Sequence, residues 1–230
     1  MIPGNFMRQL LLFLSELFLP RIISSTLESK LAGETGSKAV EVNVSSQPAL
    51  KLLAGRIETV SATVRGGRWG KIAVDKISLA GEDFRLDMGK LGEEGKLRLN
   101  SAKSYSMTGE FTEKNLLDYI RQEGSRLEDI KVRITAEGIR ATASAKVFGK
   151  KANITIEGIM VSHEGSLYLR TTKAQIENAV PGKIGLEKFF GDVQLVKRSD
   201  LPLPGGFTDV TFEDGKIIVT VDGSSLRETK

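Results

Sequence analysis

Residues 129–145 read DIKVRITAEGIRATASA, and this stretch decides the fold class. On both sides of Glu137-Gly138, every second residue is apolar. The apolar residues are Ile130, Val132, Ile134, Ile139, Ala141, Ala143 and Ala145. A period of two with one polar face is typical of antiparallel strands with one side in water, and a residue pair ending in Gly is a hairpin signal. The stretch therefore predicts a β-hairpin, and its small alanines leave room on the apolar face.

The same period of two runs from Val40 to Val221, with further hairpin signals at Glu164-Gly165 and Asp214-Gly215. We expect about ten antiparallel strands. The alternation slips between Ile57 and Val60, and again between Val74 and Ile77. A bulge at each slip would restore the pattern and curve the sheet.

Three helices complete the prediction. One lies in the apolar N-terminal region, a second spans 112–121 with Thr112 as its N-cap, and a third spans 184–190. Strands in a long meander with a few helices belong to the α+β class, here a long, curved antiparallel β-sheet. We expect an apolar or amphipathic helix and hinge over 1–36, with Gly33 in the hinge, and a single β-rich domain over 37–230.

The N-terminal segment carries LLLFLSELFL at residues 10–19. Four interpretations remain open. A transmembrane span is interrupted too early by Glu16 and Pro20, and a cleaved signal peptide lacks a clear cleavage site. The other two are a helix lying on a membrane surface and a helix packed into the domain. The residues predicted to contact a membrane are Phe6, Leu10, Leu11, Phe13, Leu14, Leu17 and Phe18.

Composition excludes several kinds of chemistry in this 230-residue chain. It has no cysteine, which excludes disulfides and thiolate metal sites, and its single histidine, His163, excludes a two-histidine site. The acidic residues are scattered, and no pair is singled out as a glycosidase pair. We expect no enzyme, no catalytic residue, no metal and no cofactor.

The basic residues suggest an anionic surface as partner. Lysine and arginine number 33 against 29 acids, a net charge of +4. Nucleic-acid binding needs a denser basic stripe with exposed aromatics, so we expect no nucleic acid. Arg65, Arg68 and Lys71 flank Trp69, a residue type that favours membrane interfaces. We predict that the three basic residues contact lipid headgroups.

Several pieces of the chain, in order, resemble one known family. They are LAGRIETVSATV from Leu53, VDKISL from Val74, FRLDM from Phe84, FTEKNLLDYI from Phe111, LPLP from Leu201 and FEDGKIIV from Phe212. The sequence is similar to the LmeA-type phospholipid-binding proteins over about 180 residues, nearly everything after Gly36. The resemblance implies an elongated, curved sheet crossed by a helix and a location in the cell envelope. The chain departs from the family at its N-terminus, which puts export in doubt.

We therefore expect a membrane-associated phospholipid-binding protein of the cell envelope, which could act as a lipid carrier. Acyl chains would lie in an apolar groove with basic residues at its rim. The predicted groove residues are Leu116, Tyr119 and Ile120, with Trp69 and Phe111 near an entrance. The alternative is a non-catalytic scaffolding β-domain attached to a membrane, whose apolar face is only core. A lipid- or glycan-modifying enzyme is the third and least favoured interpretation.

Overall fold

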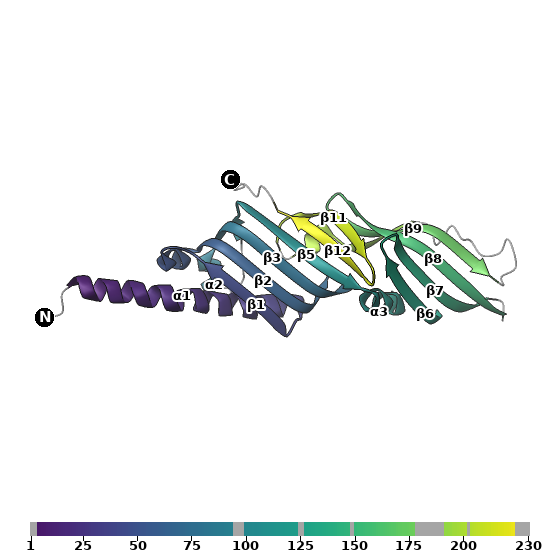
Figure 1. The fold of residues 1–230 in the computed structure, drawn as a ribbon, viewed down its shortest axis with the longest axis horizontal. Helices are drawn as coiled ribbons and strands as arrows, with labels where there is room; N and C mark the ends of the chain where they lie inside the picture. Colours follow the sequence, from purple (N-terminus) through teal and green to yellow (C-terminus); the bar gives the residue numbers. More distant parts are fainter. Residues whose placement is uncertain are drawn as a thin grey trace.

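The computed structural model describes residues 4–93, 99–123, 127–147, 150–177, 191–201 and 203–223. In these residues, twelve strands form two antiparallel sheets in an elongated molecule (Figure 1). The α+β class is confirmed, with the strands divided between two sheets. The helix expected over 184–190 lies outside the described residues.

The first sheet has seven strands in the order β1-β2-β3-β5-β12-β11, with β4 paired to β3. Its strands are β1 (Ala39–Ser45), β2 (Arg56–Trp69), β3 (Ile72–Leu86), β4 (Leu99–Ser101), β5 (Ser104–Thr112), β11 (Gly206–Glu213) and β12 (Lys216–Asp222). A 3-10 helix, η1 (Ala49–Ala54), joins β1 to β2, and α2 (Met88–Glu93) follows β3.

The second sheet has five strands in the order β10-β9-β8-β7-β6. They are β6 (Glu128–Thr135), β7 (Gly138–Val147), β8 (Lys150–His163), β9 (Ser166–Glu177) and β10 (Asp192–Val196); the short η3 (Arg198–Asp200) follows β10. The expected hairpins at Glu137-Gly138 and Glu164-Gly165 are confirmed. At the second, φ is 49° at Glu164 and 73° at Gly165, the left-handed backbone that a two-residue hairpin turn requires.

The two expected slips in the alternation occur, but not as single-strand bulges. The inward face of β2 passes from Ile57 to Val60 and then from Val64 to Gly67, and β3 changes face at the matching positions. Two residue pairs, Glu58 with Asp83 and Gly66 with Asp75, drop out of the ladder while the register is kept. Asp83 and Gly66 have φ of 52° and 69°. Both strands therefore turn over together.

Helix α1 (Gly4–Thr35) packs against the first sheet with its C-terminal half. Ile23 and Leu27 are buried, and the Glu28 Oε1 accepts a hydrogen bond from the backbone N–H of Val42 on edge strand β1 at 2.9 Å. The N-terminal turns extend beyond the sheet (Figure 1). The helix continues through Gly33, where a hinge was expected. Within the described residues, no helix combines the length and apolarity needed to cross a membrane.

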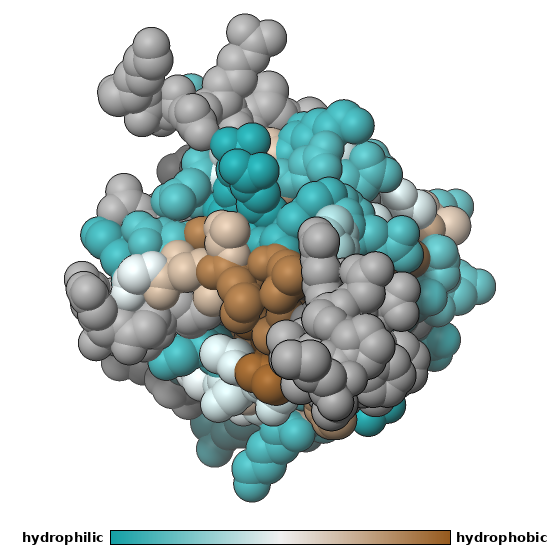
Figure 2. Space-filling model, turned by 90° about the vertical axis from the view of Figure 1, so that its left-hand side faces the viewer, coloured by the Kyte–Doolittle hydropathy of each residue, from teal (hydrophilic) through white to brown (hydrophobic). Residues whose placement is uncertain are grey.

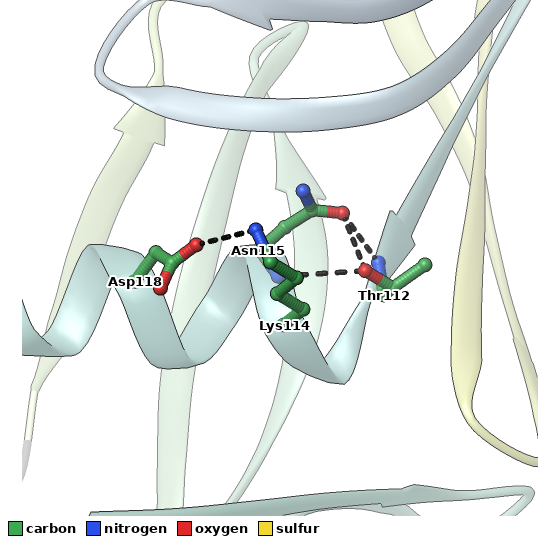
Figure 3. Close-up of polar contacts among 4 residues, drawn as sticks. All are labelled: Thr112, Lys114, Asn115 and Asp118. Carbon is green, nitrogen blue, oxygen red and sulfur yellow. Dashed lines mark hydrogen bonds and ion pairs between the residues drawn. The ribbon is translucent and has the colours of Figure 1, made fainter.

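Helix α3 (Glu113–Glu123) is fixed by its first turn. Thr112 donates from its backbone N–H and its hydroxyl to Asn115 Oδ1, both at 2.8 Å, and Asn115 N–H points back to the Thr112 hydroxyl at 3.4 Å (Figure 3). This reciprocal pair has the form of a capping box, with Asn in place of Glu. Lys114 and Asp118, at 3.1 Å, add an ion pair one turn apart (Figure 3). The expected helix and its Thr112 cap are confirmed.

The sheets meet around Trp69, which is 1% exposed. Its indole makes edge contacts with Phe111 and Phe207 at ring distances of 6.1 and 5.5 Å. It lies over Gly109, where a Cβ atom would stand 2.4 Å from the ring. Glycine is therefore required at 109 because the indole occupies the space of a side chain.

We predict that Gly109→Ala lowers the free energy of unfolding by about 1–3 kcal/mol, because the added methyl group overpacks the junction. Gly33→Ala is the control: it fills open space on a helix and should raise stability by roughly 0.5–1 kcal/mol. Urea unfolding measures both. Equal stability of Gly109→Ala and wild type would contradict the seating of Trp69 on Gly109.

A second prediction concerns Tyr105, which is 3% exposed and whose hydroxyl has no hydrogen-bond partner among the described residues. Burial, and then the charge of Asp222, raise its pKa to about 12. The unfolded chain releases this proton near pH 10, so the stabilisation is complete below pH 10 and lost as pH rises towards 12. Tyr105→Phe should remove this part of the pH dependence and leave stability at pH 7 equal or up to about 1 kcal/mol higher. Urea unfolding at pH 7 and between pH 9 and 12 tests it, and identical pH profiles would contradict it.

Candidate functional site

The inner face of the five-stranded sheet carries a furrow along β7. Ala141 pairs with Ile156, and Ala143 pairs with Ile154, so small side chains on β7 stand beside large ones on β8. The row continues on β9, where Ala174 faces Ile156 and Ile176 faces Ile154. Because side chains on one face of a sheet stand side by side, the alanines form the bottom of an apolar channel parallel to the strand.

Helix α3 covers one part of this furrow. Leu116, Tyr119 and Ile120 line the same cavity as the furrow residues. Leu116 is 1% exposed, while Ile120 is half-buried. The first turn of α3 is tied to β6, because Glu113 Oε1 accepts a hydrogen bond from the Ile134 backbone N–H at 2.9 Å. The helix is thus held at the edge of the sheet with its apolar side towards the furrow.

The cavity has a volume of about 230 Å³. This is below the roughly 300–1,000 Å³ of sites that enclose a whole drug-sized ligand. Val193 on β10 lines it and is 49% exposed, so the furrow opens to solvent on that side. A long apolar molecule could place part of its length under α3 and the rest along the open channel.

Two carboxylates of the second sheet are paired with basic side chains. Asp129 accepts hydrogen bonds from Lys151 at 2.8 Å and from the Ser144 hydroxyl at 3.0 Å, which lower its pKa. Arg170 binds Asp192 through two nitrogens at 2.7 and 2.9 Å, which lowers the pKa of Asp192. Basic partners thus keep both carboxylates ionised.

A second apolar cavity lies under α1, with a volume of about 70 Å³. It is lined by Leu27 and Leu31 of α1 and by inward-facing residues of β2 and β3, among them Ile57 and Phe84. Elsewhere in the described residues, no group of three His, Cys, Asp or Glu side chains is placed to hold a metal ion.

The structure brings together only some of the residues predicted from the sequence. Leu116, Tyr119 and Ile120 meet on the furrow cavity. Trp69 and Phe111 do not lie at an entrance: they are 1% and 0% exposed, because the junction of the sheets closes around them.

The three predicted headgroup residues lie at the far end of β2 and in the turn to β3. Arg65, Arg68 and Lys71 are exposed, and none of them lines either apolar cavity. The Arg68 guanidinium donates to the Lys71 backbone carbonyl at 2.5 Å, which fixes the turn. Their contact with headgroups stays a prediction.

The predicted membrane residues lie on α1. Phe18 is 50% exposed. The side chains of the other six, on the first turns of the helix, are outside the described part of the structure; they are Phe6, Leu10, Leu11, Phe13, Leu14 and Leu17.

The alanines of the furrow were expected to leave room on the apolar face, but they were not among the predicted lipid-binding residues. The signal was present, because Ala141 and Ala143 follow one another at a period of two where neighbouring strands carry isoleucine. The cavity under α1 was also missed, since nothing in the N-terminal sequence indicates which of its leucines face the sheet.

Comparison with known proteins gives a family. No curated protein and no solved structure matches the chain. A family model described as LmeA-like phospholipid-binding matches residues 13–222, which include both sheets and the helices that line the two cavities. Because this match spans most of the sequence, the chain belongs to the LmeA-like phospholipid-binding family.

Proposed function

We propose that this phospholipid-binding protein acts as a lipid carrier at a membrane of the cell envelope and holds an acyl chain in the β7 furrow. The observation that carries the proposal is the row of Ala141 and Ala143 between isoleucines, under the apolar side of α3. An ordinary core would fill this space with side chains of the protein itself.

The binding energy would come from burial of the acyl chain. Apolar surface removed from water contributes roughly 25 cal/mol per Å², so a chain that buries a few hundred Å² gains several kcal/mol. No covalent chemistry is needed for this. The open side at Val193 would let the lipid enter and leave without unfolding of the sheet.

The projecting end of α1 would hold the protein at the membrane. Its C-terminal half is fixed to the sheet by Ile23 and Leu27. The N-terminal half, which carries most of the predicted membrane residues, extends away from the fold (Figure 1). Phe18 and Ile22, at 50% and 57% exposure, are apolar side chains exposed near the point where the helix meets the fold.

The furrow is tested with Ala143→Trp, which places an indole on its floor. Lys173→Trp is the matched control, because Lys173 pairs with Glu157 on the opposite face of the same sheet. We expect near-stoichiometric phospholipid to copurify with wild type and the control, and several-fold less with Ala143→Trp, measured by solvent extraction and mass spectrometry. Thermal unfolding checks that both variants fold. Equal lipid in all three would place the ligand elsewhere, and no lipid in any would favour the scaffolding alternative.

The anchor is tested by deletion of residues 1–17, which leaves the helical residues that pack on the sheet. We expect cosedimentation with vesicles to fall several-fold while copurified lipid is retained. Loss of the copurified lipid together with vesicle binding would mean that the lipid adheres to the helix and is not held in the furrow. Unchanged cosedimentation would contradict the anchor.

A further inference from the structure

The end of the first sheet next to α1 and η1 exposes apolar side chains. Four large apolar residues that the structure describes as exposed lie there, at 45–57% exposure: Phe18, Ile22, Leu50 and Leu53. Helix α1 and η1 contact each other, so the two pairs lie on neighbouring elements at this end. Figure 2 shows this end of the molecule, with apolar side chains gathered near its centre and hydrophilic residues above them.

Two arginines stand side by side at the same end. Arg56 on β2 is directly opposite Arg85 on β3. The Leu86 N–H donates to the Gly55 carbonyl at 2.8 Å, which makes Arg56 and Arg85 a non-hydrogen-bonded pair, the kind in which side chains come closest. Like charges at directly opposite positions destabilise a sheet. An anion above the pair would be attracted by both guanidinium groups.

The arginines line a polar depression of about 750 Å³ with a positive excess. Its charged residues are the cations Lys51, Arg56, Arg85 and Lys103 and the acids Glu58 and Asp83. Both acids form ion pairs with lysines: Glu58 is 2.6 Å from Lys51, and Asp83 is 3.9 Å from Lys103. The Lys51 hydrogen bond lowers the pKa of Glu58, and Glu82 also contacts Lys103, at 3.7 Å. Arg56 makes no ion pair with any residue that the structure describes.

The depression adjoins the cavity under α1. Ile57 and Phe84 line both spaces, and each follows or precedes one of the arginines in the chain. The same end of the molecule therefore offers exposed apolar side chains, a basic depression and an apolar cavity behind it. Apolar side chains beside a basic depression suit a membrane interface, where anionic headgroups lie directly above acyl chains.

We propose that this end face docks on an anionic lipid bilayer. Leu50 and Leu53 of η1 enter the interface beside Phe18 and Ile22, and Arg56 and Arg85 bind the phosphodiester of a lipid headgroup. The inference rests on the proposed attachment of the protein to a membrane. It adds a second inserting element and a preference for negative charge.

The chain contains a matched control for the arginine pair. Arg133 on β6 is directly opposite Arg140 on β7, also in a polar depression. That depression is lined in addition by Glu137 and Glu157, and Arg140 lies 3.9 Å from Glu157. The second depression therefore has as many acids as cations among its lining residues, whereas the first has four cations and two acids. Removing either pair changes the net charge equally.

The test compares full-length wild type, Arg56→Gln/Arg85→Gln and Arg133→Gln/Arg140→Gln in flotation with phosphatidylcholine vesicles, with and without phosphatidylglycerol. We expect the first variant to bind anionic vesicles about 25-fold more weakly, at about fivefold per basic residue, and to bind neutral vesicles like wild type. The control should change less than twofold. The difference should shrink at high salt, because salt screens exposed charges. No change in the first variant, or equal loss in both, would overturn the proposal.

Two further measurements separate docking from lipid holding. Leu50→Ser/Leu53→Ser should weaken flotation with both kinds of vesicle, and unchanged flotation would remove η1 from the surface. Copurified phospholipid should be the same in wild type and Arg56→Gln/Arg85→Gln. Its loss would show that the arginines hold the resident lipid and would overturn the docking assignment. Wild type that floats but retains no lipid would contradict the furrow while supporting the docking surface.

Discussion

The seating of the Trp69 indole on Gly109 is the constraint on which the rest of the structure depends. It brings β2, β5 and β11 to one point, since Phe111 and Phe207 close around the same ring. From there β11 reaches the second sheet: the Phe207 N–H donates to the Gly165 carbonyl at 3.1 Å, and the Ser162 hydroxyl donates to the Phe207 carbonyl. The cavity under α1 is lined mainly by the first sheet and the cavity under α3 mainly by the second, and no described residue lines both.

One glutamate side chain accepts a backbone N–H at an edge strand of each sheet. Glu28 of α1 accepts the free N–H of Val42 on edge strand β1, and Glu113 of α3 accepts that of Ile134 on edge strand β6. An unpaired strand edge invites pairing with another chain, and a helix that lies along it prevents this. The same contacts set the position of each helix over an apolar cavity. The same two helices therefore cover the sheet edges and close the candidate sites.

The strands and α3 were predictable from sequence because their signals are local. A period of two, turn pairs such as Glu164-Gly165 and the Thr112 cap act over a few residues. The position of Trp69 could not be predicted from sequence, because it depends on Gly109. This glycine is forty residues away in the chain and two strands away in the sheet. For the same reason the apolar residues of α1 gave one signal for two environments, the sheet for Leu27 and solvent for Phe18. The shared position of Leu116, Tyr119 and Ile120 on one side of α3 could be predicted because an amphipathic helix shows its apolar side in its own sequence; their contact with lipid stays a prediction.

The paired change of face in β2 and β3 ties the lengths of the two strands together. Between Glu58–Asp83 and Gly66–Asp75, the segment of β2 from Thr59 to Arg65 is also the one that pairs with β1. An insertion or deletion in one strand would invert every residue beyond it unless its neighbour changed at the matching place. Relatives of this chain that differ in length here should therefore differ in both strands at once. Coordinated gaps on either side of the β2–β3 turn would be the evolutionary signature of this geometry.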